Sequence, residues 1–382
     1  MASLRKRTLP SGAIAWQVDY RDQHGHRRVK QFKTKGAADA FMVTARHEVK
    51  EGTHASVSAE KLSVKDVALD WLSHCETRKE TGRRMERASY EDYKGKTHNH
   101  ILDAKIGIGG LKLVRLTTAE VEEFKERLLA NGRSEVNTRK ILSVLYAIMK
   151  RAQLKKQIAK NPVDGVEVER TTRVKDRIKA PAKEAIRAMI EAASADFKPL
   201  LVVSAMCGLR ASEARGLAWE NVNFDSGVIE VRQRMDRYCV KGEPKSDAGH
   251  RDIPMGPFVI NTLKRWQEAC PKGDENLVFP GARGGVRNHA NTLNRDFYPL
   301  FESLAKKHED DPKKHPKVER FRWHDLRHFA VSLWIEQGFN IKAIQGFAGH
   351  SSIQMTMDRY GHMLPSDDHQ KGMAEIESRM FG

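Results

Sequence analysis

The 382-residue chain is longer than one typical domain, and its 40% hydrophobic content is enough to build more than one core. A formal charge of +17 indicates a polyanionic partner, nucleic acid before an anionic membrane surface. The chain has no run of about 20 apolar residues that could span a membrane and no signal-peptide apolar segment, so we expect a cytoplasmic protein.

The cysteines and histidines do not have the spacing of a metal site. The four cysteines lie far apart, at Cys75, Cys207, Cys239 and Cys270, and no C-x-x-C pair occurs. An H-E-x-x-H motif is also missing from the sequence. We therefore expect idle thiols, no metal and no cofactor.

The N-terminal segment is basic and has the pattern of a small folded module. Residues 1–50 carry 11 Lys or Arg against 4 Asp or Glu, a net charge of +7. Three segments are typical of strands and a fourth of a helix: residues 4–8, 13–20 and 26–32, then 35–50. Trp16 and Tyr20 favour a folded DNA-binding module over a solvated basic extension.

A helical region follows a small polar linker at residues 51–61. Ser63 precedes an apolar periodic segment and is a plausible N-terminal cap. A later helix is expected to begin at Asn137 or Thr138, because apolar residues then recur at helical intervals. The pattern predicts an all-α domain at roughly 62–162.

The rest of the chain is predicted to be a basic linker and a larger mixed domain. Residues 163–180 are rich in Lys and Arg and lack periodicity, which suits an interdomain linker on a phosphate backbone. Residues 181–382 read mainly as helices around a small antiparallel sheet. Its strands are expected at 228–233 and 251–255, with a turn at 241–250. The fold class is therefore multidomain α+β.

Four short motifs in this last region combine residues that suit phosphodiester chemistry. They are G-L-R-A-S-E at 208–213, H-D-L-R-H at 324–328, G-H-S-S at 349–352 and R-Y-G-H at 359–362. Arginine forks pair with phosphate oxygens, and tyrosine can act as a covalent nucleophile. Two arginines, two histidines and a tyrosine would meet the needs of phosphodiester cleavage without a metal.

In their order and spacing, these motifs resemble the tyrosine recombinases of the phage-integrase type. Arg327 precedes His350 by 23 residues, and His350 precedes Tyr360 by 10. The resemblance implies a site-specific recombinase that cuts and rejoins DNA through a 3′-phosphotyrosyl intermediate, and so integrates and helps to excise a mobile element. One departure is Phe347-Ala348, because the family commonly has leucine before Gly349.

The resemblance also assigns roles to individual residues. The catalytic positions are Arg210, Lys245, His324, Arg327, His350 and Tyr360, with Tyr360 as the nucleophile. The arginines would hold the phosphate oxygens, and His350 would donate to one of them. His324 would act near the attacking oxygen as a general base or donor. Lys245 would protonate the leaving 5′-oxygen, with Lys241 as its rival.

Three further polar residues in these motifs are expected to be structural. Glu213 is expected to position an arginine or backbone groups, and His328 and His362 to support the fold.

The implied organisation has four parts: an arm-type DNA-binding domain at 1–55, a core-binding domain at 62–162, a linker at 163–180, and a catalytic domain with a C-terminal tail at 181–382. The implied partners are double-stranded DNA attachment sites, a homotetramer on DNA, DNA-bending accessory proteins and an excisionase. The tail carries an apolar edge at Met373, Ile376 and Met380, which would fold back in cis or dock on a neighbouring protomer.

Two other functions compete with this interpretation. A type IB topoisomerase shares the chemistry, but the basic N-terminal module argues for an integrase. A non-catalytic DNA-binding regulator derived from a recombinase is disfavoured by the complete set of catalytic residues.

Overall fold

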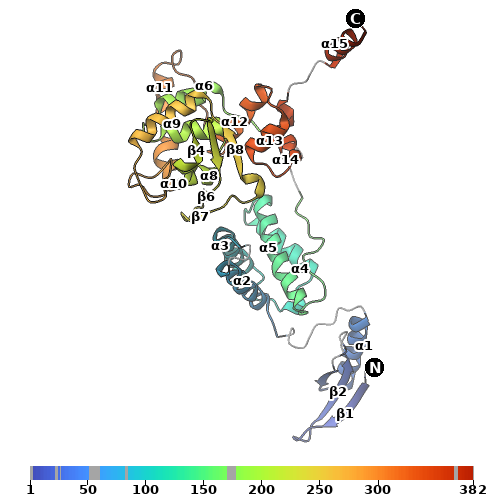
Figure 1. Ribbon diagram of the computed structural model, residues 1–382. Coiled ribbons are helices and arrows are strands. Elements are labelled where there is room, and N and C mark those ends of the chain that lie inside the picture. Colours follow the sequence, from blue (N-terminus) through green and yellow to red (C-terminus); the bar gives the residue numbers. More distant parts are fainter. Residues whose placement is uncertain are drawn as a thin grey trace. The chain divides into compact units, whose positions relative to one another are not determined.

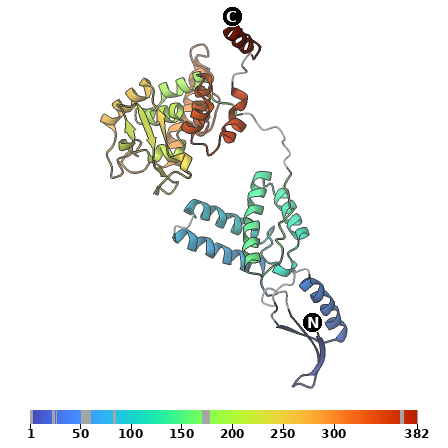
Figure 2. The same ribbon diagram turned by 45° about the vertical axis from the view of Figure 1, so that its right-hand side comes forward.

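The computed structural model describes residues 3–21, 25, 27–50, 61–81, 85–169, 178–364 and 369–381. The chain forms two compact units, Met1–Arg173 and Val174–Gly382, and each is described by itself (Figures 1 and 2). Most of the predicted linker at 51–61, residues 22–24 between the second and third predicted strands, and residues 170–177 of the predicted second linker lie outside the described residues.

The first unit begins with the predicted three-stranded sheet and helix. The elements are β1 (Ser3–Thr8), β2 (Ile14–Arg21), β3 (Arg27–Phe32) and α1 (Lys35–Lys50). The strands are antiparallel in the order β1-β2-β3. Val18 and Tyr20 of β2 pack against Ala38 and Ala45 of α1 in a small core. The predicted fold of this module is confirmed.

A helical region completes the first unit. It contains α2 (Val64–Glu80), α3 (Arg87–Lys96), a π-helical segment η1 (Thr97–Ile101), a 3₁₀ turn η2 (Leu113–Arg115), α4 (Thr118–Ala130) and α5 (Glu135–Leu154). Ser63 caps α2 by accepting a hydrogen bond from the backbone of Asp66, as the sequence predicts. Helix α5 begins earlier than predicted, because Ser134 rather than Asn137 supplies its cap.

The core of this helical region continues beyond residue 162. Val163 is buried in it, and Val166 and Val168 pack against it. The packed region therefore includes the first residues of the segment that the sequence pattern assigns to the linker.

The second unit is mainly helical around a small sheet. Its elements are α6 (Lys183–Ala192), α7 (Lys198–Cys207), α8 (Ala211–Gly216), η3 (Trp219–Asn221), β4 (Val222–Asn223), β5 (Val228–Val231), β6 (Arg234–Met235), β7 (Lys241–Gly242), η4 (Asp247–Gly249), β8 (Arg251–Pro254), α9 (Pro257–Ala269), α10 (His289–Asn291), η5 (Thr292–Phe297), α11 (Tyr298–Asp310), α12 (Asp325–Glu336), α13 (Ile341–Ala348), α14 (Ile353–Tyr360), η6 (Gly361–Met363) and α15 (His369–Phe381). Strands β4, β5 and β8 form one antiparallel sheet, and β6 and β7 form a separate ribbon.

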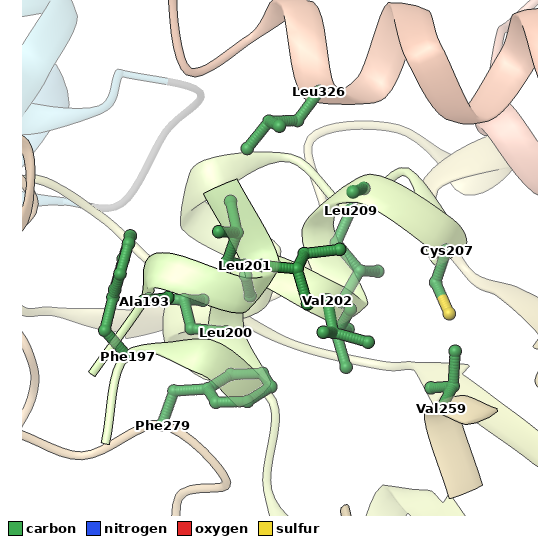
Figure 3. Packing of buried hydrophobic residues seen from close by; sticks show 14 of the residues in the cluster. Ala193, Phe197, Leu200, Leu201, Val202, Cys207, Leu209, Val259, Phe279 and Leu326 are labelled. Carbon is green, nitrogen blue, oxygen red and sulfur yellow. The ribbon is translucent and has the colours of Figure 1, made fainter. Parts of the chain in front are cut away.

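Helix α7 is the centre of this unit because it is apolar on nearly every side. It packs against α12 and α9. Figure 3 shows Leu201 and Val202 of α7 among the buried side chains, with Leu326 of α12 and Val259 of α9 in the same cluster. Burial contributes about 25 cal/mol per Å² of apolar surface, and the close packing makes this helix a rigid support for the residues that come after it in the chain.

The described part of the chain contains no helix long and apolar enough to cross a membrane. All four cysteines are free thiols, with Cys75 and Cys207 buried and Cys239 exposed.

Candidate active site

Arg210 is placed by the end of the central helix. Helix α7 ends at Gly208, whose φ of 61° is a left-handed conformation that glycine adopts without strain. Arg210 directly precedes α8, and its backbone N–H donates to Glu213 Oε2 at 2.9 Å. One guanidinium nitrogen of Arg210 donates to Glu213 Oε1 at 2.6 Å, and the other donates to the carbonyl of Gly349 at 2.7 Å. The side chain remains 36% exposed.

Arg327 reaches the same place from α12. It is only 3% exposed. Its Nη1 donates to the carbonyl of Gly208 at 2.8 Å, and its Nη2 donates to the carbonyl of Ala348. Arg210 and Arg327, far apart in sequence, therefore bind adjacent carbonyl oxygens at the end of α13, directly before His350.

Behind these arginines lies a buried ion pair. Arg251 donates to both carboxylate oxygens of Glu213, at 3.1 and 2.7 Å. It also donates to the carbonyls of Gly249 and Phe347, at 3.0 and 2.7 Å. Burial alone would raise the pKa of Glu213, but the hydrogen bonds and charge of Arg251, followed by the charge of Arg210, lower that pKa to about 2.

The cluster keeps a positive charge. Arg210, Arg251 and Arg327 interact with one carboxylate, Glu213, which leaves a formal excess of two positive charges. Burial, followed by the charges of Arg210 and Arg251, lowers the pKa of Arg327 to about 9, so the group stays protonated at neutral pH. Fixed donors with excess positive charge suit a phosphodiester, which gains negative charge on its oxygens during displacement.

The rings of Tyr360, the last residue of α14, and His350, in the short connection between α13 and α14, lie side by side. The ring of Tyr360 stacks on the ring of His350, with centroids 6.2 Å apart and planes inclined by 17°. His350 Nδ1 is 2.9 Å from Thr356 Oγ1, and both residues are buried. The Tyr360 ring is fully buried, and its hydroxyl is 2.6 Å from His328 Nδ1. Burial raises the pKa of Tyr360, although Arg327 and Arg359 oppose the shift.

His324 lies at the beginning of α12, one helical turn before His328. Its side chain is exposed, and its ring meets the ring of His328 edge-on at 4.9 Å. Among the described residues, the side chain that bonds the Tyr360 hydroxyl is His328 and not His324.

The two candidate lysines lie in different surroundings. Lys241 is in β7, paired with Met235, and its ammonium is 3.1 Å from Glu275. Lys245 is exposed in the loop that connects β7 to η4. Pro244 packs so closely on Gly249 that a Cβ there would lie 2.4 Å from it, and Arg251 bonds the Gly249 carbonyl. The loop that carries Lys245 is thus held next to the arginine cluster by the packing of Pro244 on Gly249 and by the hydrogen bond from Arg251.

Comparison with known proteins identifies the family. The sequence pattern of the "Phage integrase family" matches residues 176–366, which are half of the chain. The chain belongs to the phage integrase family. The ICEBs1 integrase of Bacillus subtilis (strain 168) is 26% identical over 297 residues, covering 75% of this chain and 76% of the relative. The transposase from transposon Tn916 of Enterococcus faecalis is 27% identical over 162 residues, covering 41% of this chain and 39% of the relative.

Solved structures show the same fold. The integrase of transposon Tn1549, in complex with a circular intermediate DNA, has a TM-score of 0.65 at 20% identity and covers 83% of this chain and all of that chain. A lambda integrase dimer bound to a COC′ core site has a TM-score of 0.55 at 18% identity and covers 93% of both chains. The predicted family, fold class and enzyme class are confirmed: the protein is a tyrosine-type site-specific DNA recombinase.

Three contacts of the site are not predicted by the sequence. The pattern indicates Arg251 only as part of a strand, whereas the structure pairs it with Glu213, and it gives no signal for Thr356, which contacts His350. His328 is expected to be structural, and the sequence does not predict its contact with the Tyr360 hydroxyl. The strand pattern does contain a signal for Arg251. Alternate residues of a strand point to the same face, so Arg251 lies on the same face as the apolar Ile253, and both are buried in β8.

The departure from the family at Phe347 is accommodated by packing. The Phe347 ring meets Trp334 and Phe339, with centroids 5.7 and 6.2 Å away. Its carbonyl still accepts a hydrogen bond from Arg251. The side chain therefore packs among aromatic residues while its backbone contacts the arginine cluster.

Acidification is expected to destabilise the second unit, which contains the candidate site and is called the catalytic unit below, at pH values under 6.5. Burial, followed by the charge of His324, lowers the pKa of His328 to about 4. Burial, followed by the charge of Arg327, lowers the pKa of His350 to about 3. Both pKa values lie below the ordinary 6.5 of histidine, so the two neutral imidazoles favour the folded state fully above pH 6.5. This contribution to the free energy of unfolding is lost as the pH falls toward 4 and 3. The free energy of unfolding should be at least about 2 kcal/mol lower at pH 5 than at pH 7.5.

Urea unfolding of the full chain at both pH values, followed at α7 by pulsed hydrogen exchange, measures this difference. A His362→Gln variant is the control, because that side chain is exposed and should leave the difference unchanged. Equal free energies at the two pH values would contradict the prediction.

Proposed function

We propose that this recombinase is the integrase of a mobile DNA element. It cuts and rejoins double-stranded attachment sites through a covalent bond between Tyr360 and a 3′-phosphate. The observation that supports these site assignments is the convergence of Arg210 and Arg327 on adjacent carbonyls, directly before a histidine whose ring stacks on Tyr360. The names of the relatives, integrases and transposases of mobile elements, support the same biological role.

The geometry supports a catalytic role for each of these residues. Arg210 and Arg327 hold the non-bridging oxygens of the phosphate, where charge develops during displacement. The hydroxyl of Thr356 can donate a hydrogen bond to His350 Nδ1, which leaves the N–H of the neutral imidazole on Nε2. That N–H can then donate a hydrogen bond to a phosphate oxygen. His324, exposed at the beginning of α12, is proposed to act near the attacking oxygen as a general base or hydrogen-bond donor.

Lys245 is the proposed acid for the leaving 5′-oxygen. It lies on the loop that the contacts of Arg251 and Pro244 with Gly249 hold next to the arginine cluster. Lys241 is less suited, because it lies in β7, before this loop, with its ammonium 3.1 Å from Glu275. A protonated amine at this position donates to the departing oxygen and avoids an unstable alkoxide.

The N-terminal module, residues 1–55, is proposed to bind separate arm-type DNA sites. The strand register puts Arg5 opposite Gln17 and Arg7 opposite Ala15, so these residues share one face of the sheet. Val18 and Tyr20 occupy the other face, against α1. A sheet face rich in arginine can follow the phosphate backbone, and its affinity for DNA would fall as the salt concentration rises.

The remaining parts complete the proposed assembly. The helical domain at 62–162, whose core extends to Val168, binds the core site. The rest of the basic segment at 163–180 is the linker that joins it to the catalytic domain at 181–382. The enzyme acts in the cytoplasm as a homotetramer on two duplexes, with DNA-bending proteins and an excisionase as further partners. A lambda integrase tetramer bound to a Holliday junction, similar in fold, supports the tetramer.

A covalent-trapping experiment tests the function. The protein is incubated with nicked DNA from the flanks of its own gene, digested, and analysed for a nucleotide on Tyr360 by mass spectrometry. An adduct on Tyr360, absent from Tyr360→Phe, is the expected result. Tight binding without any adduct would favour the non-catalytic regulator. Relaxation of supercoiled DNA without site preference would favour the topoisomerase.

The C-terminal tail is expected to couple protomers. Met373, Ile376 and Met380 follow one another at helical spacing on α15 and are 51–69% exposed. An exposed apolar stripe of this kind needs a partner surface. Truncation after residue 365 should leave single-site cleavage unchanged and abolish recombination. A triple replacement of these residues by glutamine should act in the same way. Undiminished recombination by the truncated protein would exclude the coupling role.

A further inference from the structure

The hydroxyl of the nucleophile has a specific partner that the proposed function leaves without a role. His328 Nδ1 lies 2.6 Å from the Tyr360 hydroxyl, and the imidazole is only 6% exposed. A contact this short, between two buried polar groups, fixes the orientation of the phenol. His328 therefore contacts the atom that must attack phosphorus.

The other side of the imidazole faces a carboxylate. Asp325 Oδ1 is 4.0 Å from His328 Nε2, too far for a direct hydrogen bond but close enough for a strong electrostatic preference. Arg322 holds Asp325 in place, with its backbone N–H at 2.8 Å and its guanidinium at 3.0 Å. These contacts counter the effect of burial and lower the pKa of Asp325, so the carboxylate is ionised.

The direction of the hydrogen bond follows from these charges. Burial, followed by the nearby His324, lowers the pKa of His328 to about 4, so the imidazole is neutral at neutral pH and carries one N–H. An ionised Asp325 favours that N–H on Nε2. Nδ1 then carries the lone pair, and the Tyr360 hydroxyl donates to it. The order carboxylate, imidazole, hydroxyl is the arrangement that activates hydroxyl nucleophiles in general.

We propose that His328 is the general base that accepts the phenolic proton of Tyr360 during strand cleavage. In this step the Tyr360 O–H bond breaks toward His328 Nδ1 as the bond from the phenolic oxygen to phosphorus forms. The bond from phosphorus to the 5′-oxygen breaks, and that oxygen takes a proton from Lys245. Religation runs the same transfers in reverse. The inference rests on the proposed function, and it gives the proton transfer to a residue one helical turn beyond His324.

Single-turnover cleavage of a nicked attachment site, measured from pH 5.5 to 8.5, tests the proposal. In His328→Asn, the amide oxygen can still hold the hydroxyl but cannot accept its proton at these pH values. We expect cleavage about 100-fold slower at pH 7 with unchanged DNA binding. The rate of the variant should rise about tenfold per pH unit, as hydroxide replaces the base, while the wild-type rate is nearly flat. The other charged groups that face His328 are His324, Asp325 and Arg322 around the start of α12, and Arg359 on α14.

Two further variants make the result decisive. His328→Gly opens space beside Tyr360, and added imidazole should restore its cleavage by at least about tenfold. His362→Asn, a histidine exchange at an exposed position two residues after Tyr360, should cleave like wild type. Thermal unfolding of each variant separates a lost base from a lost fold.

Three outcomes would overturn the proposal. Wild-type rates in His328→Asn would remove His328 from the reaction, and faster cleavage would mean that it only restrains Tyr360. A slower variant that keeps the wild-type pH profile and gains nothing from imidazole would show a positioning role alone. In each of these cases a Tyr360 adduct still forms in the wild type, so the proposed function stands. Absence of that adduct in the wild type would instead defeat the proposed function.

Discussion

Replacing Arg210 with lysine is expected to slow single-turnover cleavage at least about 100-fold while leaving the unfolding temperature close to that of the wild type. A lysine keeps the charge but loses the fork that binds Glu213 and the Gly349 carbonyl and that is proposed to bind the phosphate. Loss of one oriented donor to transition-state charge typically costs 10²- to 10³-fold in rate. The Gly349 carbonyl loses its guanidinium donor, but the lysine ammonium or water can replace that donor, because the Arg210 side chain is 36% exposed. Glu213 keeps its bonds to Arg251, so the fold should tolerate the change.

Arg327→Lys is the matched comparison, and it should lose both activity and stability. Arg327 is buried, and its two terminal nitrogens satisfy the carbonyls of Gly208 and Ala348. A buried carbonyl left without a donor costs about 1–3 kcal/mol. Cleavage of a nicked substrate and thermal unfolding, measured on both variants, separate the two residues. An Arg210→Lys protein that unfolds as early as Arg327→Lys would contradict this division of roles.

The functional donors could be predicted from the sequence, whereas their acceptors could not. Arg210, Arg327, His350 and Tyr360 have distinctive side chains in short motifs with fixed spacing. The groups that hold the two arginines are largely main-chain carbonyls, at Gly208, Ala348 and Gly349. Every residue carries a carbonyl, so such an acceptor leaves no mark in a sequence.

The same argument explains why Arg251 was missed and the catalytic lysine left open. The importance of Arg251 lies in contacts with Glu213 and Phe347, residues 38 and 96 positions away. The choice between Lys241 and Lys245 depends on the two-residue pairing of β6 with β7, which is too short to produce a periodic pattern. The helices and longer strands were predictable because their apolar periodicity extends over several turns or pleats.

Glu213→Gln is expected to lower the free energy of unfolding of the catalytic unit by about 3 kcal/mol at pH 7, because it leaves Arg251 buried without an anionic partner. It should also slow cleavage, since Arg210 loses its anchor. The pKa of Glu213, about 2, lies below the ordinary 4.5. The ionised carboxylate therefore stabilises the fold fully above pH 4.5, and that stabilisation is lost as the pH falls from 4.5 toward 2.

The pH dependence distinguishes a lost charge from a simple packing defect. Urea unfolding of wild type and Glu213→Gln is followed at α7 by pulsed hydrogen exchange. The difference between their free energies of unfolding should be constant between pH 5 and 8 and should become smaller below pH 4.5. Glu275→Gln is the control, because its pair with Lys241 is 44–49% exposed and should be worth less than about 1 kcal/mol. A packing defect would instead give the same difference at every pH. Equal stability of wild type and Glu213→Gln at pH 7 would mean that Arg251 is held by its carbonyl acceptors alone.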